Sequence, residues 1–81
     1  MAVKVFPVWN EVDDFLTSSP TLQQILDFHP SESAQARLRE LLTAKRERTL
    51  TPEEEAELNE TQAVEMFMQR LKVRALAKLD R

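Results

Sequence analysis

Residues 51–79 read TPEEEAELNETQAVEMFMQRLKVRALAKL, and the architecture of the protein follows from this segment. Thr51 is a suitable helix cap, Pro52 suits the first helical position, and Glu54 stands where a capping box needs an acid. No glycine or further proline interrupts the chain as far as Leu79, so we predict one helix of about 28 residues, roughly 42 Å long at 1.5 Å per residue. Acids fill its first turns and bases its last turns, which complements the helix dipole.

The predicted long helix carries two apolar stripes. A first stripe at helical spacing contains Val64, Phe67, Met68, Leu71, Ala75 and Leu79. A second stripe, Met66, Val73 and Ala77, lies on nearly the opposite side, with Leu76 between the two. A surface helix needs only one such stripe, so we expect this helix to be covered on two sides. The preceding helix would cover one side, and the N-terminal segment or another chain would cover the other.

The preceding helix is predicted over residues 32–47, with Ser31 as its cap. Its apolar face consists of Ala34, Leu38, Leu41, Leu42 and the stem of Lys45. The short link 48–51 would fold the two helices into an antiparallel hairpin.

The distribution of charge agrees with such a hairpin. Residues 1–32 carry a net −4, 33–50 a net +3, 51–65 a net −6 and 66–81 a net +4, within a total of −3. The basic end of the preceding helix would therefore lie beside the acidic start of the long helix. Alternating blocks of this kind suit elements folded back on one another better than a uniformly charged nucleic-acid binder.

The N-terminal third is predicted to be an appendage of the hairpin. Residues 1–9 are rich in Val, Phe and Trp but contain Pro7, which indicates a short edge strand or an extended arm. Asn10 would cap a short helix over 11–17, and Thr21 with Gln24 would cap a second over 22–28, ended before Pro30. The prediction is thus one all-α domain, with the arm at 1–9, short helices within 10–30 and the hairpin over 31–81.

Composition excludes several classes of site. The 81 residues include no cysteine, so disulfides and thiolate zinc sites are absent, and no glycine, which phosphate-cradling loops require. The apolar runs are far shorter than the roughly 20 residues needed to span a bilayer, and the first residues do not have the layout of a secretory signal. We therefore expect a cytoplasmic protein with no membrane association.

The sequence contains no assembled catalytic or metal site. His29 is the only histidine, and the neighbouring Ser31 and Ser33 stand where helix-capping residues belong, so no nucleophile and base are paired. The glutamates at 53, 54, 55, 57 and 60 form neither a calcium-loop pattern nor a Glu-x-x-His pair, and the helix dipole accounts for them. We expect no catalytic residue, no cofactor and no metal, and hence no enzyme.

Two features are candidates for contact with a partner. Arg70, Arg74, Lys78 and Arg81, at spacings of 4, 4 and 3, form a basic ridge along the long helix. This ridge either complements the helix dipole as a solvated face or docks an acidic protein or phosphates, with nucleic acid the weaker option because the net charge is negative. The aromatic N-terminal segment either packs across the hairpin to complete a core or is an arm that orders on a partner, with Trp9 as its anchor.

The chain from residue 20 to 79, about three quarters of its length, resembles short antitoxin-like proteins of bacteria, common in cyanobacteria. The resemblance rests on residues 20–26 (PTLQQIL), 38–42 (LRELL), 49–58 (TLTPEEEAEL) and 65–75 (EMFMQRLKVRA). Relatives often have glycine before the TLTP stretch, where this chain has Arg48, and this difference concerns the geometry of the turn. The resemblance implies a protein that binds and blocks a nuclease-type toxin encoded beside it, and it implies no catalytic residue.

From these observations we predict a small protein-binding regulator, with an antitoxin as its most specific version. The predicted partner-binding residues are Val5, Phe6, Val8, Trp9, Met66, Val73, Ala77, Arg70, Arg74 and Lys78. Two alternatives stay open. One is a structural homo-oligomer, in which two hairpins form a four-helix bundle through the second stripe, and the other is an accessory nucleic-acid-binding protein that uses the basic ridge.

Overall fold

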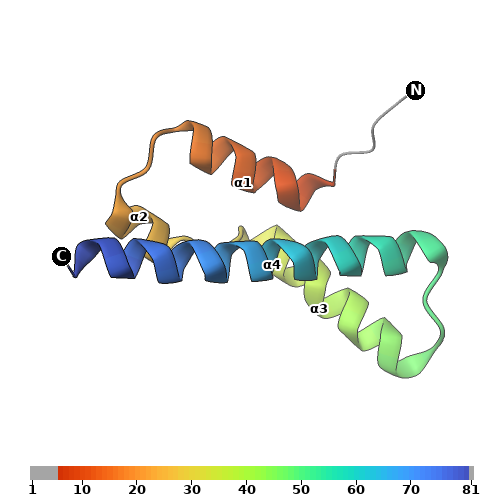
Figure 1. Ribbon diagram of the computed structural model, residues 1–81. Coiled ribbons are helices and arrows are strands. Elements are labelled where there is room, and N and C mark those ends of the chain that lie inside the picture. The colour runs from red at the N-terminus through yellow and green to blue at the C-terminus, as the bar shows by residue number, and fades with distance from the viewer. Residues whose placement is uncertain (1–5, 81) are drawn as a thin grey trace.

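The computed structural model describes residues 6–80, and this part of the chain is all-helical, with no strand. Its helices are α1 (Pro7–Thr17), α2 (Leu22–Asp27), α3 (Glu32–Glu47) and α4 (Pro52–Leu79). The long helix α4 forms the axis of the molecule, with α1 and α2 against one side of it and α3 against another (Figure 1). The predicted all-α class, with a long C-terminal helix packed against the earlier helices, is confirmed.

Caps fix three of the helix starts where the sequence placed them. The Thr51 hydroxyl accepts a hydrogen bond from the Glu54 amide at 3.1 Å, and the Glu54 carboxylate accepts one from the Thr51 amide at 2.9 Å. Thr21 and Gln24 form the same reciprocal capping box at the start of α2. At the start of α3 the Ser31 hydroxyl accepts from the Ala34 amide. Each cap satisfies amide groups that the first turn of a helix leaves without a partner.

The start of α1 differs from the prediction. Phe6 occupies the N-cap position, Pro7 begins the helix, and Asn10 lies inside it instead of capping it. The expected strand or extended arm is therefore wrong for Pro7 onward, because proline has a φ suited to the first turn of a helix. The side chains of Val8, Val12 and Phe15 also recur at helical spacing on one face. Residues 1–5, including Val5, lie outside the described residues.

The core forms between α1, α2 and α4. Val12, Val64 and Met68 are buried at its centre, and the half-buried residues around them are Val8, Trp9, Phe15, Leu16, Phe28, Phe67 and Leu71. No residue of α3 belongs to this cluster. The first stripe of α4 is thus covered by the N-terminal helices, whereas α3 meets another side, where Leu41 and Leu58 are buried.

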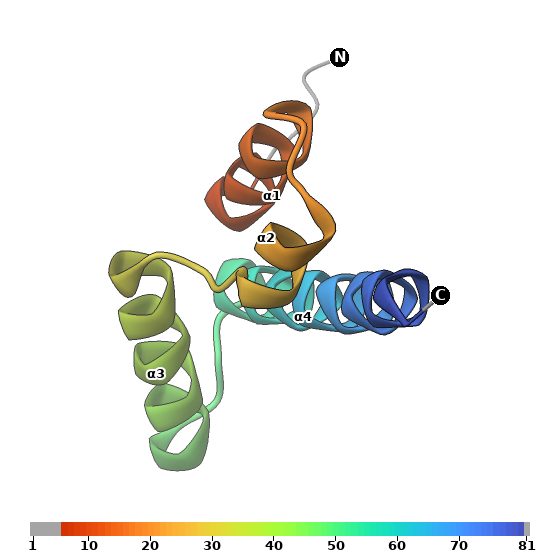
Figure 2. The same ribbon diagram turned by 90° about the vertical axis from the view of Figure 1, so that its left-hand side faces the viewer.

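Helix α3 slants away from α4, so the two form a splayed hairpin (Figures 1 and 2). Two ion pairs join them. At the link, the Arg48 guanidinium donates to both carboxylate oxygens of Glu54 at 2.7 and 2.8 Å, and further along Arg37 binds Glu57. The expected placement of basic groups of the hairpin's first helix beside acids of its second is confirmed. Leu42, predicted to belong to the apolar face of α3, is instead 41% exposed, because the slant of the helix leaves that side uncovered.

Polar contacts hold the remaining connections. The Glu11 carboxylate of α1 accepts hydrogen bonds from the amide and the hydroxyl of Ser31, at 2.9 and 2.7 Å, and so links α1 to the start of α3. Lys72 of α4 donates to the Phe28 carbonyl at the end of α2, at 2.8 Å. In the turn between α1 and α2, Ser19 has a φ of 59°, in the left-handed region.

Candidate protein-interaction surface

The second apolar stripe of α4, here called the outer stripe, consists of Met66, Val73 and Ala77. Met66 is 74% exposed and Val73 66% exposed, and Ala77 is exposed as well. By contrast, Val64, Met68 and Ala75 of the first stripe are at most 4% exposed. Leu79, the last residue of the first stripe, is exposed because it lies beyond the core. The covering elements therefore leave the outer stripe bare.

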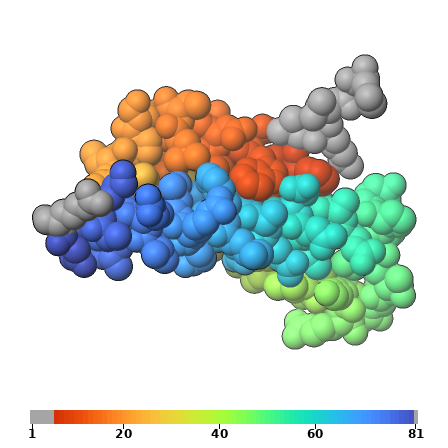
Figure 3. Space-filling model, in the orientation of Figure 1, coloured from red at the N-terminus to blue at the C-terminus, as the bar shows by residue number. Residues whose placement is uncertain are grey.

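The arrangement of the helices explains this exposure. In Figure 2, α1 and α2 lie above α4 and α3 lies to one side of it, while the C-terminal half of α4 has no helix on its remaining faces. Figure 3 shows no other helix in front of this half of α4, drawn in blue. The N-terminal segment, one of the two bodies expected to cover the side of the long helix that the preceding helix leaves open, covers the first stripe.

The basic ridge lies beside the outer stripe. The ridge residues Arg70, Arg74 and Lys78 are all exposed. Within residues 6–80, neither Arg74 nor Lys78 forms an ion pair. Arg81, the predicted end of the ridge, lies outside the described residues. The C-terminal half of α4 thus presents apolar side chains next to cations that no described carboxylate neutralises.

A shallow hollow joins the ridge to the stripe. Ala63, Met66, Phe67 and Arg70 line it, and its volume is about 400 Å³. The Arg70 guanidinium carbon lies 5.8 Å from the centroid of the Phe67 ring, a distance compatible with a cation–π contact. Sequence reasoning missed Ala63 because alanine contributes no large apolar side chain, and it left Leu76, which is 53% exposed, out of the contact residues. Ala63 and Leu76 are identified as neighbours of the outer stripe only by their positions around the helix.

The N-terminal residues of the predicted contact lie in a different place. Val8 and Trp9 are half-buried and pack against the core cluster. Trp9 lies edge-on to Phe67, with ring centroids 5.8 Å apart. Phe6, at the N-cap position, is half-buried and lines a cavity between α1, α3 and α4. The structure does not bring Phe6, Val8 or Trp9 together with the outer stripe into one exposed face.

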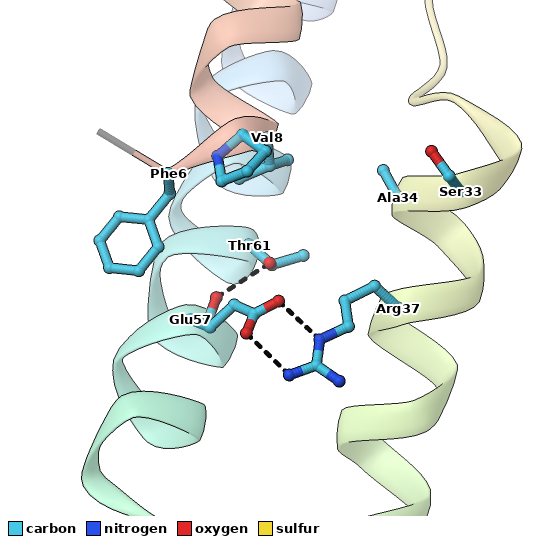
Figure 4. A pocket seen from close by; sticks show the side chains of 8 residues that line it. Phe6, Val8, Ser33, Ala34, Arg37, Glu57 and Thr61 are labelled. Carbon is cyan, nitrogen blue, oxygen red and sulfur yellow. Dashed lines mark hydrogen bonds and ion pairs between the residues drawn. The ribbon is translucent and has the colours of Figure 1, made fainter. Parts of the chain in front are cut away.

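The cavity lined by Phe6 forms because α3 slants away from α4 (Figure 1). It has a volume of about 150 Å³, and a neighbouring cavity of about 370 Å³ shares Val8, Ala34 and Thr61 with it. Figure 4 shows Ala34 on α3 across the gap from Val8, with Arg37 reaching over to Glu57 on α4. The two charged residues that line the smaller cavity, Arg37 and Glu57, are paired with one another.

The two ion pairs that connect α3 and its link to α4, Arg37–Glu57 and Arg48–Glu54, are structural in character. Arg37 donates to both Glu57 oxygens, at 2.7 and 3.0 Å, and to Glu40 at 3.0 Å. These hydrogen bonds raise the pKa of Arg37 above its ordinary value, so the guanidinium stays charged. At the link, the hydrogen bonds from Arg48 and from the Thr51 amide lower the pKa of Glu54 to about 2. Neither ion pair provides a group that could transfer a proton near neutral pH.

The described residues contain no group of three or more His, Asp or Glu side chains placed to hold a metal ion. His29 is exposed, and its Nδ1 lies 3.3 Å from the Pro30 carbonyl oxygen. None of the helices within residues 6–80 is both long enough and apolar enough to cross a membrane.

Comparison of the chain with protein-family models, with curated proteins and with solved structures gave no match.

Proposed function

We propose that this chain is a small protein-binding regulator whose contact surface is the C-terminal half of α4. The observation that carries the proposal is the exposure of Met66 and Val73, at 74% and 66%, on a helix whose opposite face is buried. Single exposed apolar residues are common, but several aligned along one helix face are typical of interaction sites. An amphipathic partner element could cover them in the manner of helix-in-groove recognition.

The partner's chemistry follows from the basic ridge. Arg70, Arg74 and Lys78 flank the outer stripe, so a partner with an apolar strip bordered by carboxylates would complement both features. Nucleic acid would engage the ridge but would leave the outer stripe uncovered, which favours a protein. We place the contact on the outer stripe and the ridge rather than on Val8 and Trp9, since those two residues are packed against the core.

The most specific version of the proposal is an antitoxin that neutralises a nuclease-type toxin encoded beside it. Its support is the resemblance over residues 20–79 together with the bare helix face. An inhibitor needs no reactive group of its own, and it acts by occupying or distorting the enzyme's site.

The test is affinity capture of the tagged chain from its native host after nuclease treatment, followed by mass spectrometry and reconstitution with the purified candidate. We expect an enzyme from a neighbouring gene at one-to-one stoichiometry, inhibited by the wild-type chain. The Met66→Glu/Val73→Glu variant should lose inhibition, and the Arg70→Gln/Arg74→Gln/Lys78→Gln variant should weaken it in a salt-dependent way. The control is Leu42→Glu, which changes an exposed apolar residue on α3 and should inhibit normally. Recovery of the chain with no enzyme at stoichiometric amount would overturn the proposal.

A further inference from the structure

The exposed face of α4 has a heptad pattern in addition to the two apolar stripes. Counting through the outer stripe in alternating steps of 3 and 4 gives Ala56, Asn59, Ala63, Met66, Arg70 and Val73, and Ala77 continues the series. All of these residues are exposed except Ala56, which is half-buried. Steps of 3 and 4 bring side chains to one seam of a helix, as in coiled coils, and small residues in the seam let two helices approach closely.

We propose that this seam pairs with the seam of a second copy of the chain, with the two α4 helices antiparallel. The charges along α4 select this direction. Residues 51–65 carry six acids and no base, whereas residues 66–81 carry five bases and one acid. An antiparallel pair sets the acidic half of each helix beside the basic half of the other, while a parallel pair would set like charges side by side.

One register satisfies both packing and charge. With Ala63 opposite Met66 of the second copy, Ala56 falls opposite Val73, so that each large side chain faces a small one. Asn59 then faces Arg70, where a polar pair in the seam fixes the register. Along one flank, Glu53 comes beside Arg74 of the second copy, and Arg74 has no ion-pair partner among residues 6–80. This register overlaps nearly the whole of α4, a contact roughly 39 Å long for 26 residues at 1.5 Å each.

The seam is accessible to a second copy. Helix α1 packs on the flank of the seam that contains Glu60 and Phe67, where Trp9 contacts both, and it leaves Glu53 and Arg74 exposed at the two ends of that flank. Helix α2 approaches the side of Lys72, and α3 is tied to the side of Glu57. None of these elements lies over Met66 or Val73, which are 74% and 66% exposed. The inference concerns the isolated chain and so goes beyond the proposed function. A partner that uses the same face must displace the second copy.

The first test is the mass of the full chain in solution, by light scattering and sedimentation equilibrium across micromolar to submillimolar concentrations. We expect a dimer for the wild type and for the control Leu42→Glu. Met66→Glu should weaken dimerisation on the order of tenfold or more, because it buries a carboxylate in the seam. Its circular dichroism should be unchanged, since Met66 does not contribute to the core. A wild-type monomer at submillimolar concentration would overturn this inference and leave the proposed partner binding standing.

The second test fixes direction and register with disulfides. The chain has no cysteine, so introduced thiols are unique. Equimolar Ala63→Cys and Met66→Cys variants, mixed and mildly oxidised, should give a covalent heterodimer in severalfold excess over either homodimer. A parallel pair would instead cross-link each variant to itself, and that result would overturn the proposed arrangement.

Discussion

The indole nitrogen of Trp9 donates a hydrogen bond to the Glu60 carboxylate at 2.7 Å, across 51 positions of sequence. The same indole ring packs against Phe67, so one side chain makes both a polar and an apolar contact with α4. Buried or half-buried tryptophans usually find such a partner for their N–H. This pair of contacts holds the N-terminal half of α1 against the long helix.

Replacing Trp9 should therefore destabilise the fold. We expect Trp9→Ala to lower the free energy of unfolding by about 2–3 kcal/mol, somewhat less than for a fully buried aromatic residue, because the side chain is half-exposed. Trp9→Phe keeps a six-membered aromatic ring but loses the five-membered ring and the hydrogen bond to Glu60, so it should lower the free energy of unfolding by about 1–2 kcal/mol. Urea unfolding followed by circular dichroism measures both, with Leu42→Ala, at an exposed apolar residue outside the seam, as the control. Equal effects of Trp9→Ala and Leu42→Ala would contradict the packing of Trp9 against the core.

Trp9 also shows where sequence reasoning succeeded and where it failed. The caps at Thr21, Ser31 and Thr51 are local, since each depends on residues three positions apart, and all three were predictable. For Trp9 the prediction was a strand or an extended arm, because Pro7 interrupts a segment rich in Val and Phe, and the structure has a helix there. The choice depends on packing against α4, far away in the sequence.

The candidate interaction surface was likewise predictable from the sequence only in part. The outer stripe could be found from the spacing of Met66 and Val73, because periodicity places side chains around a helix. Periodicity does not tell which neighbour covers which side, and the sequence analysis left open which stripe α3 would cover. In the structure α1 and α2 cover the first stripe, and α3 meets another side. The slant of α3 decided this outcome and also left Leu42 exposed.

A second prediction concerns the junction of α1 and α3. The Glu11 carboxylate binds the amide and hydroxyl of Ser31, so it places a negative charge at the N-terminus of α3. We expect Glu11→Ala to lower the free energy of unfolding by about 1 kcal/mol. Amide hydrogen exchange in the first turn of α3 should rise more than in α4. Asp13→Ala changes a neighbouring exposed acid and should stay within about 0.5 kcal/mol of the wild type.

The turn between α1 and α2 offers a stabilising change. Ser19 adopts a φ of 59° in a chain with no glycine. A non-glycine residue in this region is strained by roughly 1–2 kcal/mol, part of which glycine would lose again through its greater freedom in the unfolded chain. We therefore expect Ser19→Gly to raise the free energy of unfolding by about 0.5–1 kcal/mol. Ser18→Gly is the matched control, because Ser18 has a φ of −83° and should gain nothing. A loss of stability in Ser19→Gly would contradict the left-handed conformation.

The last prediction is a pH dependence at the start of α4. Hydrogen bonds from Arg48 and from the Thr51 amide hold the pKa of Glu54 at about 2, below its ordinary value of 4.5. A carboxyl group with a lowered folded-state pKa stabilises the fold above its unfolded pKa and loses that contribution as the pH falls through the folded pKa. Glu54→Gln keeps a side chain able to complete the capping box but removes the charge.

The stability difference between wild type and Glu54→Gln should therefore be constant above about pH 5, shrink between pH 4.5 and 2, and vanish below. Urea unfolding at low ionic strength from pH 6 to pH 2 measures it, and added salt should reduce it because the pair is exposed. Glu55→Gln, another acid in the first turn, lacks the Arg48 contact and should show little of this change. If the free energies of unfolding of wild type and Glu54→Gln differed by the same amount from pH 6 to pH 2, Arg48 and Glu54 would not pair in solution.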